Sequence, residues 1–198
     1  MSGNDLAGRG GRAEPALYPD FIELPGAEGG LYARPTTDRL HRIERAQLVP
    51  LVPDDAFAFF ADAYKLEAIT PPWLHFRILT PRPITMREGT LIDYRLTLHG
   101  LRLRWRTRIR TWQQGRRFVD VQVRGPFSLW EHTHEFERKD DGTLIRDVVR
   151  YRLPCGPLGA IAHGALVRRD LQRIFDFRRE AVANLLGAEH LSVGRLEL

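Results

Sequence analysis

The sequence predicts an α+β domain in which a curved antiparallel sheet of about six or seven strands wraps around a long C-terminal helix. Between residues 73 and 153, apolar and polar residues alternate with a period of two in successive short segments. From residue 159 to residue 186 the spacing becomes helical and proline is absent. A helix with one apolar face must bury that face, and the concave side of the sheet is its only large partner. This arrangement favours a ligand-sized cavity.

Length and composition limit the class of protein. The chain has 198 residues, enough for one domain with a substantial core, and a formal net charge of +5 that favours solubility. Its single cysteine, Cys155, excludes an intrachain disulfide and a cysteine metal cluster. No apolar stretch approaches the roughly 20 residues that span a bilayer, and no secretory signal is visible. The expected location is the cytoplasm.

Three regions are expected along the chain. Residues 1–35 mix glycine, proline, alanine and charge without a period, which is typical of a flexible or loosely docked arm. The apolar residues among positions 17–24 leave open whether this arm packs onto the domain or over a cavity mouth. Residues 36–187 form the domain, and residues 188–198 a C-terminal tail.

The first part of the domain combines a strand with two short helices. Residues 40–49 alternate as a strand and Pro50 ends it. Asp54 is the expected N-cap of a helix that begins with Ala56. A second helical piece over residues 64–69 ends at the prolines 71–72, because the residue before a proline avoids helical angles.

Strands and one long helix make up the rest. The strands are expected over residues 73–79, 90–99, 101–112, 118–124, 127–138 and 144–153. A Lys-Asp-Asp-Gly turn at 139–142 predicts a hairpin, and Gly187 is the expected end of the long helix. The apolar face of that helix contains Leu166, Val167, Leu171, Ile174, Phe175, Val182 and Leu185. Its remaining surface is assigned to arginines, namely Arg168, Arg169, Arg173, Arg178 and Arg179.

Six short stretches carry a family resemblance in addition to the order of elements. They lie at residues 69–74, 89–94, 104–107, 124–127, 130–136 and 166–171. Together they resemble one bacterial subgroup of the SRPBCC superfamily, which includes the START and Bet v 1-like helix-grip proteins. The resemblance covers about residues 42–183 and implies binding of a hydrophobic or amphipathic small molecule in an internal cavity. Relatives of this kind include lipid carriers, quinone-binding proteins and polyketide cyclases.

Two histidines are the main candidates for chemistry. On a strand, residues two apart share a face, so His132 and His134 point the same way as the apolar Trp130 and Phe136. Facing a cavity, the imidazoles could orient a ligand carbonyl, act as acid or base, or ligate a metal. Alternatively, they make structural hydrogen bonds across the sheet. A metal site needs a third ligand that two histidines do not supply, so no metal is predicted.

The preceding strand can be read in two ways. The default interpretation buries its valines, whereas the opposite register brings Asp120 and Gln122 beside the histidines. A carboxylate there would raise the proton affinity of a histidine and fix its tautomer. Tyr94 and Trp105 lie on apolar strand faces and are expected to line the cavity or the core.

Charged residues elsewhere are assigned to the surface. Asp93 and Asp147 are expected to be solvated members of ion pairs with nearby arginines. The alternating arginines at 102–110 could bind nucleic acid or an anionic membrane surface. Since no recognisable nucleic-acid motif accompanies them, a solvated face paired with acidic neighbours is the expected structure.

The preferred hypothesis is a carrier or sensor that binds a lipid, a quinone or an aromatic polyketide-like molecule. The alternative is a cyclase or dehydratase in which His132, His134 or Asp120 is catalytic. The second alternative is a basic surface-interaction protein, and transient contact with a membrane surface stays open. No cofactor and no specific nucleic-acid partner are predicted, and catalysis and oligomeric state are left open. The predicted ligand-binding residues are Tyr94, Trp105, Asp120, Gln122, Trp130, His132, His134 and Phe136.

Overall fold

The structure is a computed structural model, and it describes residues 40–154 and 166–187. The predictions for the arm at 1–35, the tail at 188–198, Cys155 and the first turns of the long helix lie outside the described residues. In chain order the elements are β1 (His41–Val49), α1 (Pro53–Ala61), α2 (Lys65–Ala68), the 3₁₀ helix η1 (Pro72–Leu74), β2 (Arg77–Ile78), β3 (Leu91–Leu98), β4 (Leu101–Gln113), β5 (Arg117–Arg124), β6 (Leu129–Lys139), β7 (Gly142–Arg152) and α4 (Arg168–Leu186).

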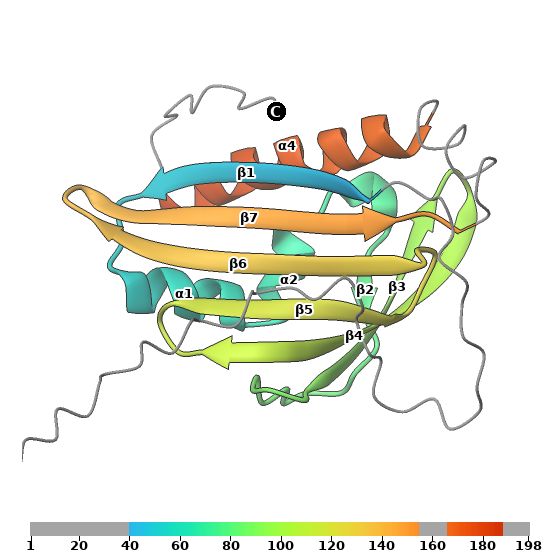
Figure 1. The fold of residues 1–198 in the computed structure, drawn as a ribbon, viewed down its shortest axis with the longest axis horizontal. Helices are drawn as coiled ribbons and strands as arrows, with labels where there is room; N and C mark the ends of the chain where they lie inside the picture. The colour runs from blue at the N-terminus through green and yellow to red at the C-terminus, as the bar shows by residue number, and fades with distance from the viewer. Residues whose placement is uncertain (1–39, 155–165, 188–198) are drawn as a thin grey trace, which may run out of the picture. The chain divides into compact units, whose positions relative to one another are not determined.

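The strands form one curved antiparallel sheet. Its order is β1-β7-β6-β5-β4-β3-β2, so β2 to β7 follow one another as a meander and β1 joins the far side of β7. Figure 1 shows β1, β7, β6 and β5 side by side. The predicted fold class, a sheet with a C-terminal helix and short helices after the first strand, is confirmed.

Helix α4 packs its apolar stripe on the sheet. Leu171 and Phe175 form a buried cluster with Val149 and Tyr151 of β7. Two helical turns further, Val182 joins a second buried cluster that includes side chains of α1 and β5. Gly187 has a φ of 68° and its N–H donates to the carbonyl of Ala183, so the helix ends where the sequence predicted.

Helix α1 differs from the prediction at its start. The N-cap is Val52 and not Asp54, because Pro53 occupies the first helical position. Proline fits there since its φ is already helical and the missing N–H would have no helical partner. Asp54 instead lies in the first turn, where a carboxylate interacts favourably with the helix dipole. The fully buried Phe57 of this helix contacts Phe118 and Phe136 of the sheet at ring distances of 5.7 and 5.3 Å.

The predicted strand at 73–79 is largely wrong. Pro72 starts a single 3₁₀ turn that ends at Leu74, and the following residue, His75, has a left-handed φ of 44°. Arg77 and Ile78 form the short strand β2 that pairs with β3, and the Leu79 N–H donates to the Asp93 carbonyl of β3. The proline favours the turn by fixing the backbone angle, and local alternation of apolar residues is too weak to override it.

Candidate functional site

A pocket of about 270 Å³ lies among the sheet, the short helices and α4. Much of its wall is apolar and aromatic, with contributions from Phe60, Leu66, Ile92, Leu103, Trp105, Trp130 and Phe175. Polar side chains interrupt this wall at Tyr94, Thr107, Asp120, His132, His134 and Arg178. Apolar pockets with a few placed polar groups are typical of small-molecule sites.

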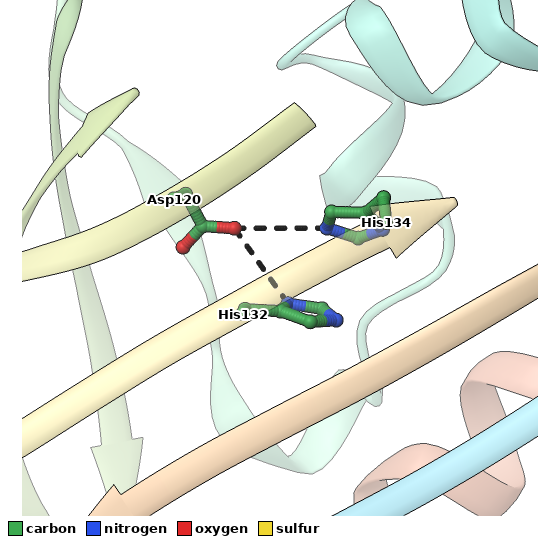
Figure 2. Close-up of side chains that lie close together, drawn as sticks. All are labelled: Asp120, His132 and His134. Atoms are coloured by element: carbon green, nitrogen blue, oxygen red, sulfur yellow. Dashed lines mark ion pairs between the residues drawn. The ribbon is translucent and has the colours of Figure 1, made fainter. Parts of the chain in front are cut away.

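Strand pairing brings the central polar groups together. Asp120 of β5 lies opposite His132 of β6, and His134 lies opposite Asp147 of β7. Only 6 and 7% of the His132 and His134 side chains are exposed, against 16% for Asp120 and 13% for Asp147. Figure 2 shows the Asp120 carboxylate directed at both imidazole rings. The inward register, which the sequence left open, is therefore the observed one for Asp120.

The two rings lie between two carboxylates. Asp120 Oδ2 is 3.7 Å from His132 Nδ1 and 3.6 Å from His134 Nε2, and both distances are longer than a hydrogen bond. The opposite ring nitrogens face Asp147 Oδ1, at 3.4 Å from His132 Nε2 and 2.6 Å from His134 Nδ1. His132 Nε2, His134 Nδ1 and Asp147 Oδ1 are buried and close to one another, yet none of these three atoms makes a well-aligned hydrogen bond.

Burial and mutual proximity set the protonation of the cluster. Burial opposes a charge on His134, but the carboxylates of Asp147 and Asp120 outweigh it and raise the pKa of this imidazole. Burial and the neighbouring His134 lower the pKa of His132. Burial alone would raise the pKa of Asp147, but the two histidines hold it well below its usual range. His134 is therefore the more basic of these two imidazoles, whose ring centres lie 3.9 Å apart.

Aromatic neighbours hold the imidazoles in place. Phe118 stacks on His134 with ring centres 4.3 Å apart and an interplanar angle of 25°. The edge of Phe175 from α4 meets His132 at 5.6 Å and 81°. The rings are therefore confined by the sheet on one side and by the long helix on the other, which restricts their rotation.

Arg178 is a pocket residue that sequence reasoning missed. It lines the pocket from α4, and its Nε is buried without a hydrogen-bond partner. Burial lowers the pKa of its guanidinium, while the carboxylates of Asp147 and Asp120 act in the opposite direction. The sequence contained the signal, because Arg178 lies three residues after Phe175 and four before Val182 on the buried stripe of the helix.

Asp147 is a second residue that was placed wrongly. It is not a solvated ion-pair member but the buried neighbour of both histidines. Alternation along β7 puts it on the same face as Ile145, Val149 and Tyr151, all of which are buried. A carboxylate within such a row was the available signal. Asp93, by contrast, accepts two hydrogen bonds from the exposed Arg106, as predicted.

Six of the eight predicted ligand-binding residues line the pocket, namely Tyr94, Trp105, Asp120, Trp130, His132 and His134. The Tyr94 hydroxyl lies 3.1 Å from Thr107 Oγ1, and its ring stacks near Trp105. Phe136 belongs instead to the buried core around Phe57. Gln122 hydrogen-bonds the backbone of Phe127 through its side-chain amide.

The arginines of β4 show the predicted pairing at two positions. Arg106 binds Asp93, and Arg110 donates to the buried carboxylate of Glu131 at 2.6 Å. Such pairs compensate part of the positive charge on this face of the sheet. Of the helices that the structure describes, none has the length and apolar character needed to cross a membrane.

Solved structures with the same fold define the class of protein. The protein CV1439 from Chromobacterium violaceum matches with a TM-score of 0.58 and 14% identity, over 75% of this chain and 98% of that one. Ara h 8.0201 matches with a TM-score of 0.55 and 16% identity, over 75% and 98% of the two chains. Major latex-like protein 151 from Panax ginseng gives 0.53 and 9%, over 74% and 97%. Together with the family match described next, this architecture is the helix-grip fold of the SRPBCC superfamily.

The family follows from a match to residues 49–178. These residues fit the family described as polyketide cyclase / dehydrase and lipid transport, and the chain belongs to that family. No curated protein sequence matches the chain. The low identities to the solved structures support the fold alone.

Proposed function

We propose that this protein binds a hydrophobic or amphipathic small molecule in the pocket and acts as a carrier or sensor. The observation that carries the proposal is a pocket with an apolar wall and two buried donors that lack partners, Trp105 Nε1 and Arg178 Nε. A buried donor without an acceptor is costly, and a ligand oxygen would satisfy it. The ligand is therefore expected to have an apolar body and a carbonyl, carboxylate or phenolate oxygen.

The size of the pocket narrows the class of ligand. At about 270 Å³ it lies just below the usual range of small-molecule pockets, which is roughly 300–1,000 Å³. This volume favours a compact ring system or a single short chain over a two-chain lipid. The aromatic side chains Trp105, Trp130 and Phe127 contact one another around the pocket and suit a planar ligand.

Tryptophan fluorescence tests the proposal directly. A titration with single-chain fatty acids, quinones and polyphenolic ketones should change the fluorescence emission of Trp105 and Trp130, which line the pocket. The titration uses the Trp73→Phe variant, because Trp73 is exposed, lies outside the pocket and adds a background signal. Arg178→Met should weaken binding of an anionic ligand by about 10- to 100-fold, the loss expected for a hydrogen bond to a charged group. Arg169→Met, at an exposed position of the same helix, should leave affinity unchanged.

Two results would contradict the carrier proposal. One is the failure of every compound in the panel to bind, together with the absence of a bound molecule in native mass spectra of protein purified from its own host. The other is equal affinity in wild type and Arg178→Met for a ligand that carries an anionic group.

A second candidate function is a cyclase or dehydratase that acts on an aromatic polyketide-like substrate. The observation that favours it is the position of His132 and His134 in the pocket wall with carboxylates on both sides. An imidazole oriented by a carboxylate is a common general acid or base. His132→Ala should then abolish conversion of a poly-β-ketone, followed by mass spectrometry, and retain its binding. If wild type binds such a compound but never converts it, the carrier function stands alone.

A further inference from the structure

We propose that Asp120, His132 and His134 form a binding site for one divalent transition-metal ion, and that Asp147 orients the two histidine rings for it. Two imidazole nitrogens and one carboxylate oxygen are a donor set that suits zinc and ferrous ions. Calcium and magnesium prefer oxygen ligands alone, so they fit this set less well. The inference goes beyond the proposed ligand binding and does not depend on it.

The spacing of the three donor atoms supports one shared ion. Asp120 Oδ2, a nitrogen of His132 and a nitrogen of His134 all lie within 4.8 Å of one another. The two distances from Asp120 Oδ2 are 3.7 and 3.6 Å. Around a tetrahedral ion with bonds of about 2.1 Å, neighbouring ligand atoms lie about 3.4 Å apart. The two distances from Asp120 exceed this spacing by only a few tenths of an ångström, and both rings converge on Asp120 in Figure 2. The two ring nitrogens lie within 4.8 Å of each other and would also have to approach this spacing when an ion binds.

Asp147 supplies the second argument. A metal-binding histidine usually donates its other ring N–H to a carboxylate, which fixes the tautomer. Asp147 Oδ1 faces His134 Nδ1 at 2.6 Å and His132 Nε2 at 3.4 Å, on the side of each ring away from Asp120. When both imidazoles are neutral and those two nitrogens carry their protons, the nitrogens that face Asp120 carry lone pairs. An ion that binds there would displace any additional proton on His134. Two lone pairs and a carboxylate would then face one another in a buried space, an arrangement that a cation stabilises.

The surroundings are those of an open rather than a closed metal site. The histidines are buried, and Asp120, His132 and His134 all line the pocket. Three protein ligands leave at least one coordination position, which structural zinc sites fill with a fourth residue. Here that position would face the pocket, where water or an oxygen of the bound ligand could occupy it. A histidine nitrogen bonded to the metal cannot also accept a proton from a substrate, so a bound ion and the acid–base candidate exclude each other at that atom.

Zinc binding to the full chain tests the inference. After treatment with a chelator and its removal, calorimetric titration with Zn²⁺ should give one ion per chain. Asp120→Asn, His132→Gln and His134→Gln should each abolish that binding. Asp147→Asn keeps all three ligands and should weaken binding by about 10- to 100-fold. His75→Asn is the matched control, because His75 is an exposed histidine whose φ of 44° asparagine tolerates.

A measurement on wild type keeps the test decisive if a buried variant fails to fold. Of the seven histidines, only His132 and His134 should show shifted side-chain nitrogen resonances when Zn²⁺ is added. The inference is overturned if wild type binds no Zn²⁺, Co²⁺ or Fe²⁺. It is also overturned if the shifted histidines are others, or if a folded Asp120→Asn protein binds with wild-type affinity. Ligand binding measured with the chelator present tests the proposed function separately.

Discussion

Replacing His134 and Asp147 by alanine, singly and together, measures how strongly burial couples the two charges at the pocket. The two side chains approach to 2.6 Å with exposed fractions of only 7 and 13%. At an effective dielectric constant of about 20, the attraction of unit charges at this distance is about 6 kcal/mol. Relaxation and the second histidine reduce it, so we expect a coupling free energy of about 2–3 kcal/mol in the double-mutant cycle.

The exposed pair of Arg106 and Asp93 is the matched control. Its geometry is better, with two hydrogen bonds of 2.8 Å, but its side chains are 46 and 39% exposed. Solvent screening should make its coupling free energy clearly smaller than that of the buried pair. Burial, and not the number of hydrogen bonds, is then the factor that sets the difference between the two pairs.

Urea unfolding at pH 7 with a chelator present provides both coupling energies from the free energy of unfolding of each variant. If the effects of His134→Ala and Asp147→Ala add to within about 0.5 kcal/mol, the buried pair is not coupled and the reasoning fails. The same conclusion follows if the exposed pair shows the larger coupling.

Three further predictions concern the core, the pocket phenol and the β6–β7 turn. Phe57→Ala should lower the free energy of unfolding by about 3–5 kcal/mol, because the fully buried ring of Phe57 packs on three aromatic neighbours. In the same urea titration, Val52→Ala at an exposed position should change the free energy of unfolding by less than about 0.5 kcal/mol. Burial raises the pKa of Tyr94, so the folded phenol stays neutral while the unfolded one ionises above about pH 10, and stability is lost as the pH rises further. Tyr94→Phe should therefore flatten the fall in unfolding free energy between pH 10 and 11, and an unchanged slope would contradict this assignment. Gly142→Ala should lower the midpoint of thermal unfolding by more than Gly89→Ala does. A Cβ at Gly142 would overlap the carbonyl of Val49, whereas the space beside Gly89 is empty. Equal shifts of the two midpoints would refute the overlap.

The sequence predicts the sheet and the helix well because their periods differ over long segments. The alternation of β4 and the helical spacing of α4 each extend over more than ten residues, so single exceptions do not hide the period. The predicted strand at 73–79 lacked this redundancy. A seven-residue segment that begins beside two prolines has too few positions to decide between a strand and a turn.

The site was less predictable because it depends on which strand faces meet. On β5 both Phe118 and Val119 are buried, so burial of apolar residues could not decide which face holds Asp120. Asp147 and Arg178 were assigned to the surface because they are charged, although both stand in rows of buried apolar residues. A charged residue is assigned to the surface when it is judged by its type alone. A charged residue within a row of buried apolar residues is nevertheless what a functional pocket is expected to contain.

The pairing of β1 with β7 has a consequence for the synthesis of the chain. Every other neighbouring pair in the sheet joins consecutive strands, which can form as soon as each hairpin leaves the ribosome. The partner of β1 lies about 100 residues later, so at about 5–20 residues per second β1 waits roughly 5–20 s for it. Throughout that interval the backbone N–H and C=O groups of β1 have no partner strand. Factors that bind nascent chains could therefore bind β1 before β7 pairs with it.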